Sequence, residues 1–178
     1  KKKFFISYSK NPTVLENFLP KDDECNRIGS IYEIPYNMIS FLNDLFYKIK
    51  KIKSACLIID YAKFKIFGNS LKSIKKHKII SPFKKIGSSD LSTHVNFNLI
   101  KKISNQFNLV THGPINQENF LINLGIMYRA KTLFKNANNN QKKNLEKGLD
   151  FLINEKKMGK IFNVISISNK NINKLTGF

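Results

Sequence analysis

The feature that most constrains the fold is a short, continuous apolar run at residues 55–59, which ends in Asp60 and Tyr61. An uninterrupted run of this length is typical of a parallel strand that is covered on both faces. Apolar residues at helical spacing precede the run over 38–49 and follow it over 99–107. Strands that alternate with helices predict an α/β fold with a mostly parallel sheet.

The remaining elements follow from the same periodicities. The predicted strands lie at 3–8, 55–59, 109–111 and 161–167, and the predicted helices at 35–49, 99–107, 120–127 and 145–159. Pro35 suits the first position of its helix, and Met158-Gly159 suits the end of the last helix. We expect the last strand to run antiparallel. Residues 62–89 read as a long, basic, irregular loop, a kind that is commonly functional.

Length and composition limit the class of protein. The chain has 178 residues, enough for one domain, so we expect a single unit over 1–178. No apolar run approaches the roughly 20 residues that span a bilayer, so no membrane partner is expected. Cys25 and Cys56 are too few for a disulfide framework or a zinc site, which indicates a reducing compartment.

The net charge of +19 invites a nucleic-acid interpretation, but the cations are 29 lysines and only two arginines, Arg27 and Arg129. Specific nucleic-acid readers normally use arginine for bidentate contacts. The lysines are scattered, and Lys, Asn and Ile are favoured together by A/T-rich codons. We therefore predict no specific nucleic-acid partner, although an unspecific, salt-dependent affinity for polyanions follows from the charge.

Residues 87–97 carry Asp90, His94 and Asn96 in what reads as a helix entry. Asp90 and His94 are four apart, so on a helical turn they would share one face and form a candidate site. The alternative is a capped turn, in which Asp90 or Ser92 accepts free amide hydrogens and His94 is half-buried packing.

Other polar residues are candidates by position. Asp60 follows a predicted strand, where an open α/β sheet binds its ligands, although it could equally cap the next turn. Glu33 precedes a helix start, and His77 lies in the basic loop. The three histidines have no metal-ligand spacing, so we predict no metal site.

Gln117 and Arg129 lie twelve residues apart, more than three turns, and cannot contact the same small group on a continuous helix. Arg129 stands out in a lysine-rich chain, because a position that keeps arginine can require its planar fork. A structural salt bridge is the alternative. No two of the eight glycines are two residues apart, so no Gly-x-Gly loop lets a nucleotide-like ligand approach the backbone.

A series of segments along the whole chain resembles the MidA-type family of class I S-adenosylmethionine-dependent methyltransferases. The segments are GSIYEIP (29–35), LIIDY (57–61), KHK (76–78), SDLSTHVNF (89–97), GPINQENFL (113–121), LGIMYR (124–129) and MGKIFNVI (158–165). The resemblance implies a Rossmann-like class I sheet of which this chain is the C-terminal part. The cofactor loop for S-adenosylmethionine would lie upstream, so no cofactor-binding residue is expected here.

The resemblance also implies site residues. Asp60, Asp90 and His94 are the expected catalytic residues, and the expected substrate-binding residues are Glu33, Tyr61, His77, Gln117 and Arg129. The chain departs from the family at Ala62, Lys72, Ser92 and Asn96, where the family favours Gly, Arg, Thr and Asp. The change at Asn96 removes a carboxylate and with it any acid or base role there.

The implied activity is methyl transfer to arginine in a protein substrate, linked in mitochondrial members to assembly of respiratory complex I. Arginine stays cationic, so its site needs acidic partners. We expect the enzyme to be active at full length and the isolated chain to be inactive. The alternative is a truncated or degenerate methyltransferase that binds a protein or a polyanion. The compartment would be the cytoplasm in a bacterium, which we favour, or the mitochondrial matrix in a eukaryote.

Overall fold

The computed structural model describes residues 4–19, 28–61, 68–172 and 174–178. The chain divides into two compact units, the first formed by 1–36 with 65–94 and the second by 37–64 with 95–178. The first unit contains the 3-10 helix η1 (Val14–Phe18) and strands β2 (Lys72–Lys75), β3 (Lys78–Ile80) and β4 (Asp90–Ser92). The second contains α1 (Tyr36–Lys51, from its second residue on), β1 (Ala55–Tyr61), α2 (Phe97–Gln106), β5 (Val110–Asn116), α3 (Gln117–Asn123), α4 (Ile126–Lys135), α5 (Asn139–Ile153), α6 (Met158–Ile161) and β6 (Phe162–Ser168).

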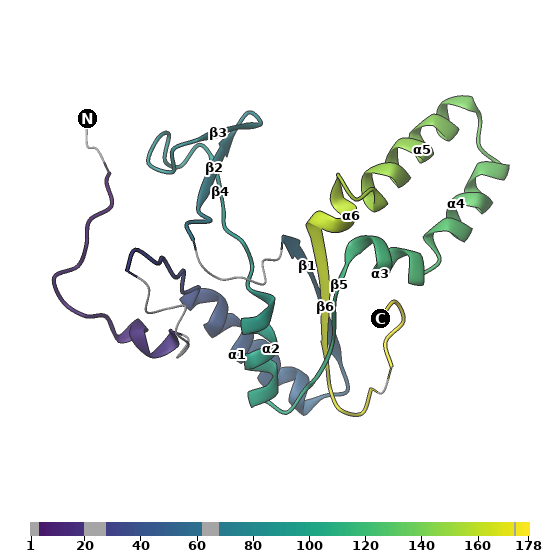
Figure 1. Cartoon of the computed structure of the whole chain (residues 1–178). Helices are drawn as coiled ribbons and strands as arrows, with labels where there is room; N and C mark the ends of the chain where they lie inside the picture. The colour runs from purple at the N-terminus through teal and green to yellow at the C-terminus, as the bar shows by residue number, and fades with distance from the viewer. Residues whose placement is uncertain (1–3, 20–27, 62–67, 173) are drawn as a thin grey trace. The chain divides into compact units, whose positions relative to one another are not determined.

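The second unit is built on a three-stranded sheet in the order β1-β6-β5 (Figure 1). Strand β6 pairs antiparallel with both neighbours, which confirms the expected antiparallel last strand. Strands β1 and β5 therefore run in the same direction, with β6 between them. The expected mostly parallel sheet is not what the described strands form, because every pair among them is antiparallel.

The buried centre of this sheet is β6, where residues 164–168 are all buried. By contrast, β1 alternates between exposed and half-buried residues, and Leu57, Ile59 and Tyr61 are exposed. The prediction that 55–59 is a strand is confirmed, but its assignment as a central strand covered on both faces is wrong for the described residues. A continuous apolar run shows that the strand has few polar residues, but it does not show how many neighbouring strands or helices cover it.

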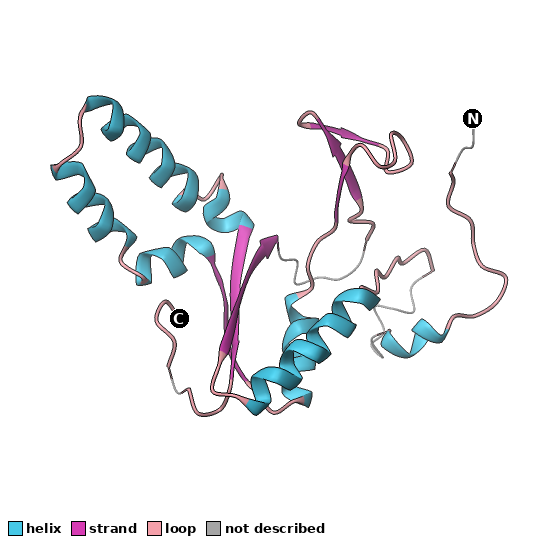
Figure 2. Cartoon of the chain, turned by 180° about the vertical axis from the view of Figure 1, so that it is seen from behind, coloured by secondary structure: helices cyan, strands magenta, loops and turns pink. Residues whose placement is uncertain are grey.

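Helices α1 and α2 lie on one side of the sheet, and α3 to α6 lie on the other (Figures 1 and 2). Helix α1 starts one residue after Pro35 and buries Leu42, Phe46 and Ile49, at the periodicity of an amphipathic helix. In α2, Ile100 and Ile103 are buried in the same way. Both helices were predicted from their apolar spacing. None of the helices in the described ranges is long and apolar enough to cross a membrane.

The helices after β5 differ from the expectation. The predicted helix through 127 is divided by Gly125, whose φ of 85° is left-handed, so α3 ends and α4 begins there. Helix α5 is capped by Asn138 in a capping box and ends at Ile153, earlier than expected. Gly159 lies inside α6 instead of ending α5. A Cβ at Gly159 would overlap the carbonyl of Ile153, so the close approach requires glycine.

The first unit contains a small antiparallel sheet in the order β3-β2-β4. The prediction of an irregular loop over 62–89 is therefore wrong for residues 72–80, and residues 62–67 lie outside the described part. Strands of three or four residues carry too little alternation to be detected. The strand predicted at 3–8 is also wrong, since residues 4–8 form no strand and Phe4, Phe5 and Ile6 are exposed.

Candidate functional site

Two of the predicted site residues in the first unit meet at Ser70. The Glu33 carboxylate accepts hydrogen bonds from the backbone N–H of Ser70 at 2.9 Å, from the Leu71 N–H at 3.2 Å and from the Ser70 hydroxyl. The same hydroxyl accepts the backbone N–H of His94 at 3.0 Å. We call Glu33, Ser70 and His94 the serine cluster. It joins three segments that are far apart in the sequence.

Ser70 is 9% exposed, whereas Glu33 and His94 are half-buried, so the centre of the serine cluster is withdrawn from water and its two ends are not. Hydrogen bonds to a carboxylate are stronger than neutral ones, and partly buried donors without an acceptor are costly. The cluster therefore holds the segments at Glu33, Ser70 and His94 together within the first unit. Sequence reasoning missed Ser70, because one serine in a lysine-rich stretch carries no spacing signal.

Asp90 and His94 do not share a helical face, so that prediction is wrong. Asp90 lies in β4, opposite Ile74 of β2, and is exposed. Helix α2 begins only at Phe97, and its cap is Asn96, whose side chain accepts the N–H of Leu99 at 3.0 Å. The alternative of a helix cap in this segment is confirmed, but the capping residue is Asn96 and not Asp90 or Ser92. An amide oxygen caps as well as a carboxylate, so Asn96 performs this role without a charge.

His77 lies in the two-residue turn between β2 and β3, where Lys75 pairs with Lys78. Both turn residues, Lys76 and His77, have positive φ, of 48° and 60°. This is the conformation of a type I′ turn, which usually takes Asn and Gly. The turn borders a hollow of about 590 Å³ that is lined mainly by lysines. His77 is therefore presented at an exposed, basic hairpin tip.

In the second unit, Asp60 lies at the edge of the sheet where β1 and β5 end and β6 begins. Asn163 of β6 is directly opposite both Asp60 of β1 and Asn116 of β5. Opposite residues have Cβ atoms about 4.5–5.5 Å apart and point to the same face, so these three side chains form a polar row. We call it the Asp60 row. Asn163 and Asn116 were not predicted, because strand register is needed to align them.

Within the Asp60 row, one carboxylate oxygen of Asp60 accepts the N–H of Tyr61 at 2.7 Å. A carboxylate offers about four acceptor positions, so this bond leaves capacity for a ligand. Asn116 accepts the N–H of Asn119 at 2.8 Å and caps α3. Tyr61 stacks on Phe162 at 4.1 Å between ring centroids, while 46% of Tyr61 remains exposed.

Gln117 follows the Asp60 row directly, as the first residue of α3. It is 6% exposed, and its side-chain amide donates to the carbonyl of Leu152 at 2.8 Å. This contact ties α3 to the end of α5. Its substrate-binding role stays a prediction.

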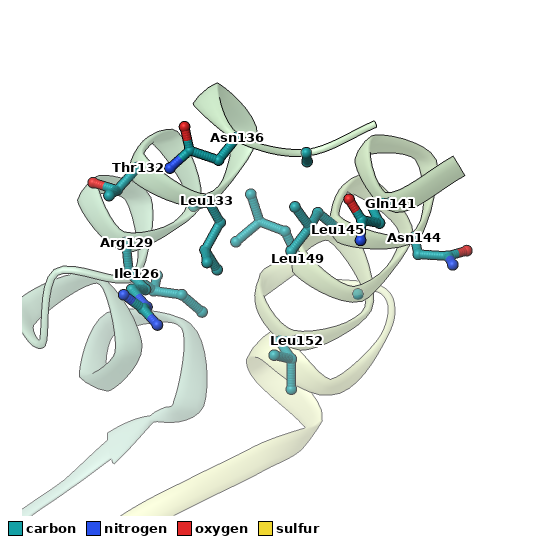
Figure 3. Close-up of a pocket in the computed structure, with 13 residues that line it drawn as sticks. Ile126, Arg129, Thr132, Leu133, Asn136, Gln141, Asn144, Leu145, Leu149 and Leu152 are labelled. Carbon is teal, nitrogen blue, oxygen red and sulfur yellow. The ribbon is translucent and has the colours of Figure 1, made fainter. Parts of the chain in front are cut away.

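Arg129 lies beyond the break at Gly125, on α4. It is one of the residues that line a groove between α4 and α5 (Figure 3). Arg129 is therefore placed with the α4–α5 pair, and Gln117 with the sheet edge.

Three of the predicted site residues thus fall into two polar groups: Glu33 and His94 into the serine cluster of the first unit, and Asp60 into the Asp60 row of the second. Neither contains a glycine-rich turn between a strand and a helix, the feature that lets a backbone approach a nucleotide-like cofactor. The residues of these two groups therefore do not form a binding site for S-adenosylmethionine. What they can supply is carboxylates and amides, which orient and neutralise a cationic substrate.

Sequence comparison identifies the family. The profile of a family described as "Putative S-adenosyl-L-methionine-dependent methyltransferase" matches residues 1–115. The chain is similar to the zebrafish mitochondrial protein arginine methyltransferase NDUFAF7, with 28% identity over 169 residues. It is 27% identical over 168 residues to the human protein of the same name. These matches cover 95% and 94% of this chain but only 39% and 36% of the relatives, so the chain spans well under half of their length.

Structure comparison agrees on the fold. A crystal structure of a Burkholderia thailandensis protein bound to S-adenosyl-homocysteine aligns with a TM-score of 0.72 at 22% identity. The alignment covers 82% of this chain and 39% of that one. A second structure from the same organism aligns with a TM-score of 0.70 at 23% identity, covering 79% and 39%. The α/β fold of the chain is therefore that of these proteins.

Proposed function

Because the chain belongs to this S-adenosyl-L-methionine-dependent methyltransferase family, we propose that it forms the acceptor side of an enzyme that methylates arginine in a protein substrate. The observation that carries the proposal is the Asp60 row, which places a half-buried carboxylate where β1 and β5 end. This edge is where α/β sheets bind ligands. The names of the zebrafish and human relatives support arginine as the acceptor.

The chemistry follows from the charge of arginine. Its guanidinium stays protonated near neutral pH, so a carboxylate must orient it and a base must take a proton as the nitrogen is methylated. We assign the orienting role to Asp60 of the second unit, whereas Asp90 and His94 of the first unit are the further catalytic residues that the family resemblance implies. Most of the catalysis would be positioning of the two reactants.

In this proposal Glu33 and Ser70 are positioning residues, since their hydrogen bonds fix the backbone at His94. Tyr61, His77, Gln117 and Arg129 are the further substrate contacts that the family resemblance implies. S-adenosylmethionine would be held by chain outside the described residues, and the B. thailandensis complex with S-adenosyl-homocysteine supports that cofactor. The named relatives are mitochondrial, so the compartment we propose is the mitochondrial matrix if the source is eukaryotic and the cytoplasm if it is bacterial.

The test uses protein expressed from its complete reading frame, S-adenosylmethionine with a labelled methyl group, and a cell extract as acceptor. Asp60→Asn and Asp90→Asn variants should lose labelling of protein arginine while still binding S-adenosyl-homocysteine in a calorimeter. Asp44→Asn on the exposed side of α1 is the control and should keep wild-type labelling. Unchanged labelling by both site variants would remove these carboxylates from the site. Absence of cofactor binding by the wild-type protein would favour the non-catalytic binding module.

A further inference from the structure

The groove between α4 and α5 has a volume of about 810 Å³ and an apolar floor. Ile126 and Leu133 of α4 point into it, facing Leu145, Leu149 and Leu152 of α5 (Figure 3). Neither helix contains a buried residue, and Leu133 and Leu152 are each 37% exposed. Within the described residues, the apolar groove between the two helices is therefore open to solvent.

The groove is long enough for a short helix. The leucines of α5 recur at intervals of four and three residues, which places them in one stripe along the helix. At 1.5 Å per residue, the ten residues of α4 extend about 15 Å and the fifteen of α5 about 22 Å. The stripe from Leu145 to Leu152 spans about 10 Å, so it matches about two turns of a partner helix, which would bind through anchors at i, i+3 or i+4, and i+7.

Gly148 is an independent observation that favours binding of a ligand in the groove. It lies inside α5 and lines the groove, yet a Cβ at this position would meet no atom within 4 Å. Glycine in a helix interior is unfavourable relative to alanine, so neither helix formation nor packing within the described chain explains it. A missing side chain on the groove floor would let another backbone approach closely.

The charges around the groove select an acidic occupant. Arg129 is the one charged residue among those that line it, and the other polar lining residues include the amides of Asn136 and Gln141. On α5, Glu146 does not line the groove, and Asp150 is paired with Lys157. The whole chain carries a charge of +19, which opposes the approach of a second copy or of a basic helix.

We propose that the α4–α5 groove binds an acidic amphipathic helix of a partner protein. The leucine stripe of the partner would lie on the leucines of α5 and on Leu133, over the open floor at Gly148. A carboxylate on the edge of the partner helix would pair with Arg129. The proposal concerns binding only and does not depend on methyl transfer.

The test uses the whole chain and a fluorescein-labelled, designed 16-residue helical peptide. The peptide carries leucines at positions 2, 5, 6, 9, 12, 13 and 16 and glutamates at most other positions, and a matched peptide replaces every glutamate by lysine. Fluorescence anisotropy should show binding of the acidic peptide and not of the basic one. Gly148→Leu should weaken the affinity at least about tenfold, whereas Asn140→Leu, on α5 outside the groove, should leave it unchanged.

Arg129→Glu is the second variant, and it should also weaken binding of the acidic peptide. If circular dichroism shows that Gly148→Leu is misfolded, the affinity of Arg129→Glu for the acidic peptide tests the proposal instead. Raising the salt concentration should reduce the wild-type affinity, because the charge pairing is screened. Equal binding by the wild type and the Gly148→Leu chain, or equal binding of both peptides, would overturn the proposal. If the wild-type chain self-associates in sedimentation and Gly148→Leu abolishes this, the groove binds a second copy of the chain. That result would also overturn the proposal.

Discussion

Removing the Glu33 carboxylate should loosen the first unit at Ser70 and Leu71. Glu33→Ala deletes the acceptor of two backbone N–H groups and of the Ser70 hydroxyl. Hydrogen bonds to charged groups contribute about 1.5–3 kcal/mol each, and partly buried donors left without acceptors add about 1–3 kcal/mol. Because Glu33 is itself half-buried, water can replace some of these bonds. We expect a loss of about 2–4 kcal/mol in local stability.

The assay is native-state hydrogen exchange, because it reports each amide separately. In Glu33→Ala the amides of Ser70 and Leu71 should exchange about 30-fold faster or more, since about 1.4 kcal/mol corresponds to a factor of ten. Ser70→Ala should instead accelerate the amide of His94, whose acceptor it removes. Amides of β6, in the other unit, serve as the internal control and should keep their rates.

The double variant completes the test. The two side chains share a hydrogen bond, so the combined loss should be smaller than the sum of the single losses by about 1–2 kcal/mol. Additive losses, or unchanged exchange at Ser70 and Leu71 in Glu33→Ala, would refute the serine cluster as the element that fixes these segments.

Three further predictions concern single features. Replacing Lys76-His77 by Asn-Gly should raise stability by about 1–2 kcal/mol in urea unfolding, because the positive φ angles cease to be unfavourable; a loss would contradict the type I′ turn. Gly159→Ala should destabilise the chain by about 1–3 kcal/mol in the same assay, since its methyl group would overlap a backbone carbonyl, whereas wild-type stability would contradict that close approach. The hydrogen bond from Lys157 lowers the pKa of the Asp150 carboxyl, so this interaction stabilises the fold above the unfolded pKa, near 3.8, and is lost as the pH falls through the folded pKa. Asp150→Asn should therefore lower the melting temperature slightly at pH 6 and by less at pH 2, and an equal difference at both values would contradict the pairing.

The parts of the fold that could be predicted are those in which one periodicity extends over several turns or over a whole strand. Helix α1 was predicted because its apolar side chains return to one face every three or four residues. Strand β6 was predicted from its β-branched residues. The antiparallel direction of β6 was also expected and is confirmed.

What could not be predicted depends on neighbours that are distant in the sequence. The apolar run at 55–59 indicates a strand but not that β6, instead of β1, is the buried centre. The alignment of Asp60 with Asn163 across β1 and β6 requires a strand register that no local pattern encodes. The cap of α2 was misplaced, because several residues before Phe97 can act as caps and only the backbone geometry selects Asn96.

The two cysteines illustrate the same limit for reactivity. Burial raises the pKa of the Cys56 thiol above its ordinary value, which no sequence pattern around it indicates. Cys25 lies outside the described residues. The expectation of too few cysteines for a disulfide framework rests on their number alone.

The most direct test of the central claim is the methylation of protein arginine by protein expressed from the complete reading frame, compared with its Asp60→Asn variant. The measurement is mass spectrometry of methylarginine formed from labelled S-adenosylmethionine, with cofactor binding recorded in parallel. We predict labelled methylarginine with the wild-type protein, and with Asp60→Asn a loss of labelling but normal cofactor binding. Equal labelling by both proteins would contradict the role of the Asp60 row in binding the methyl acceptor.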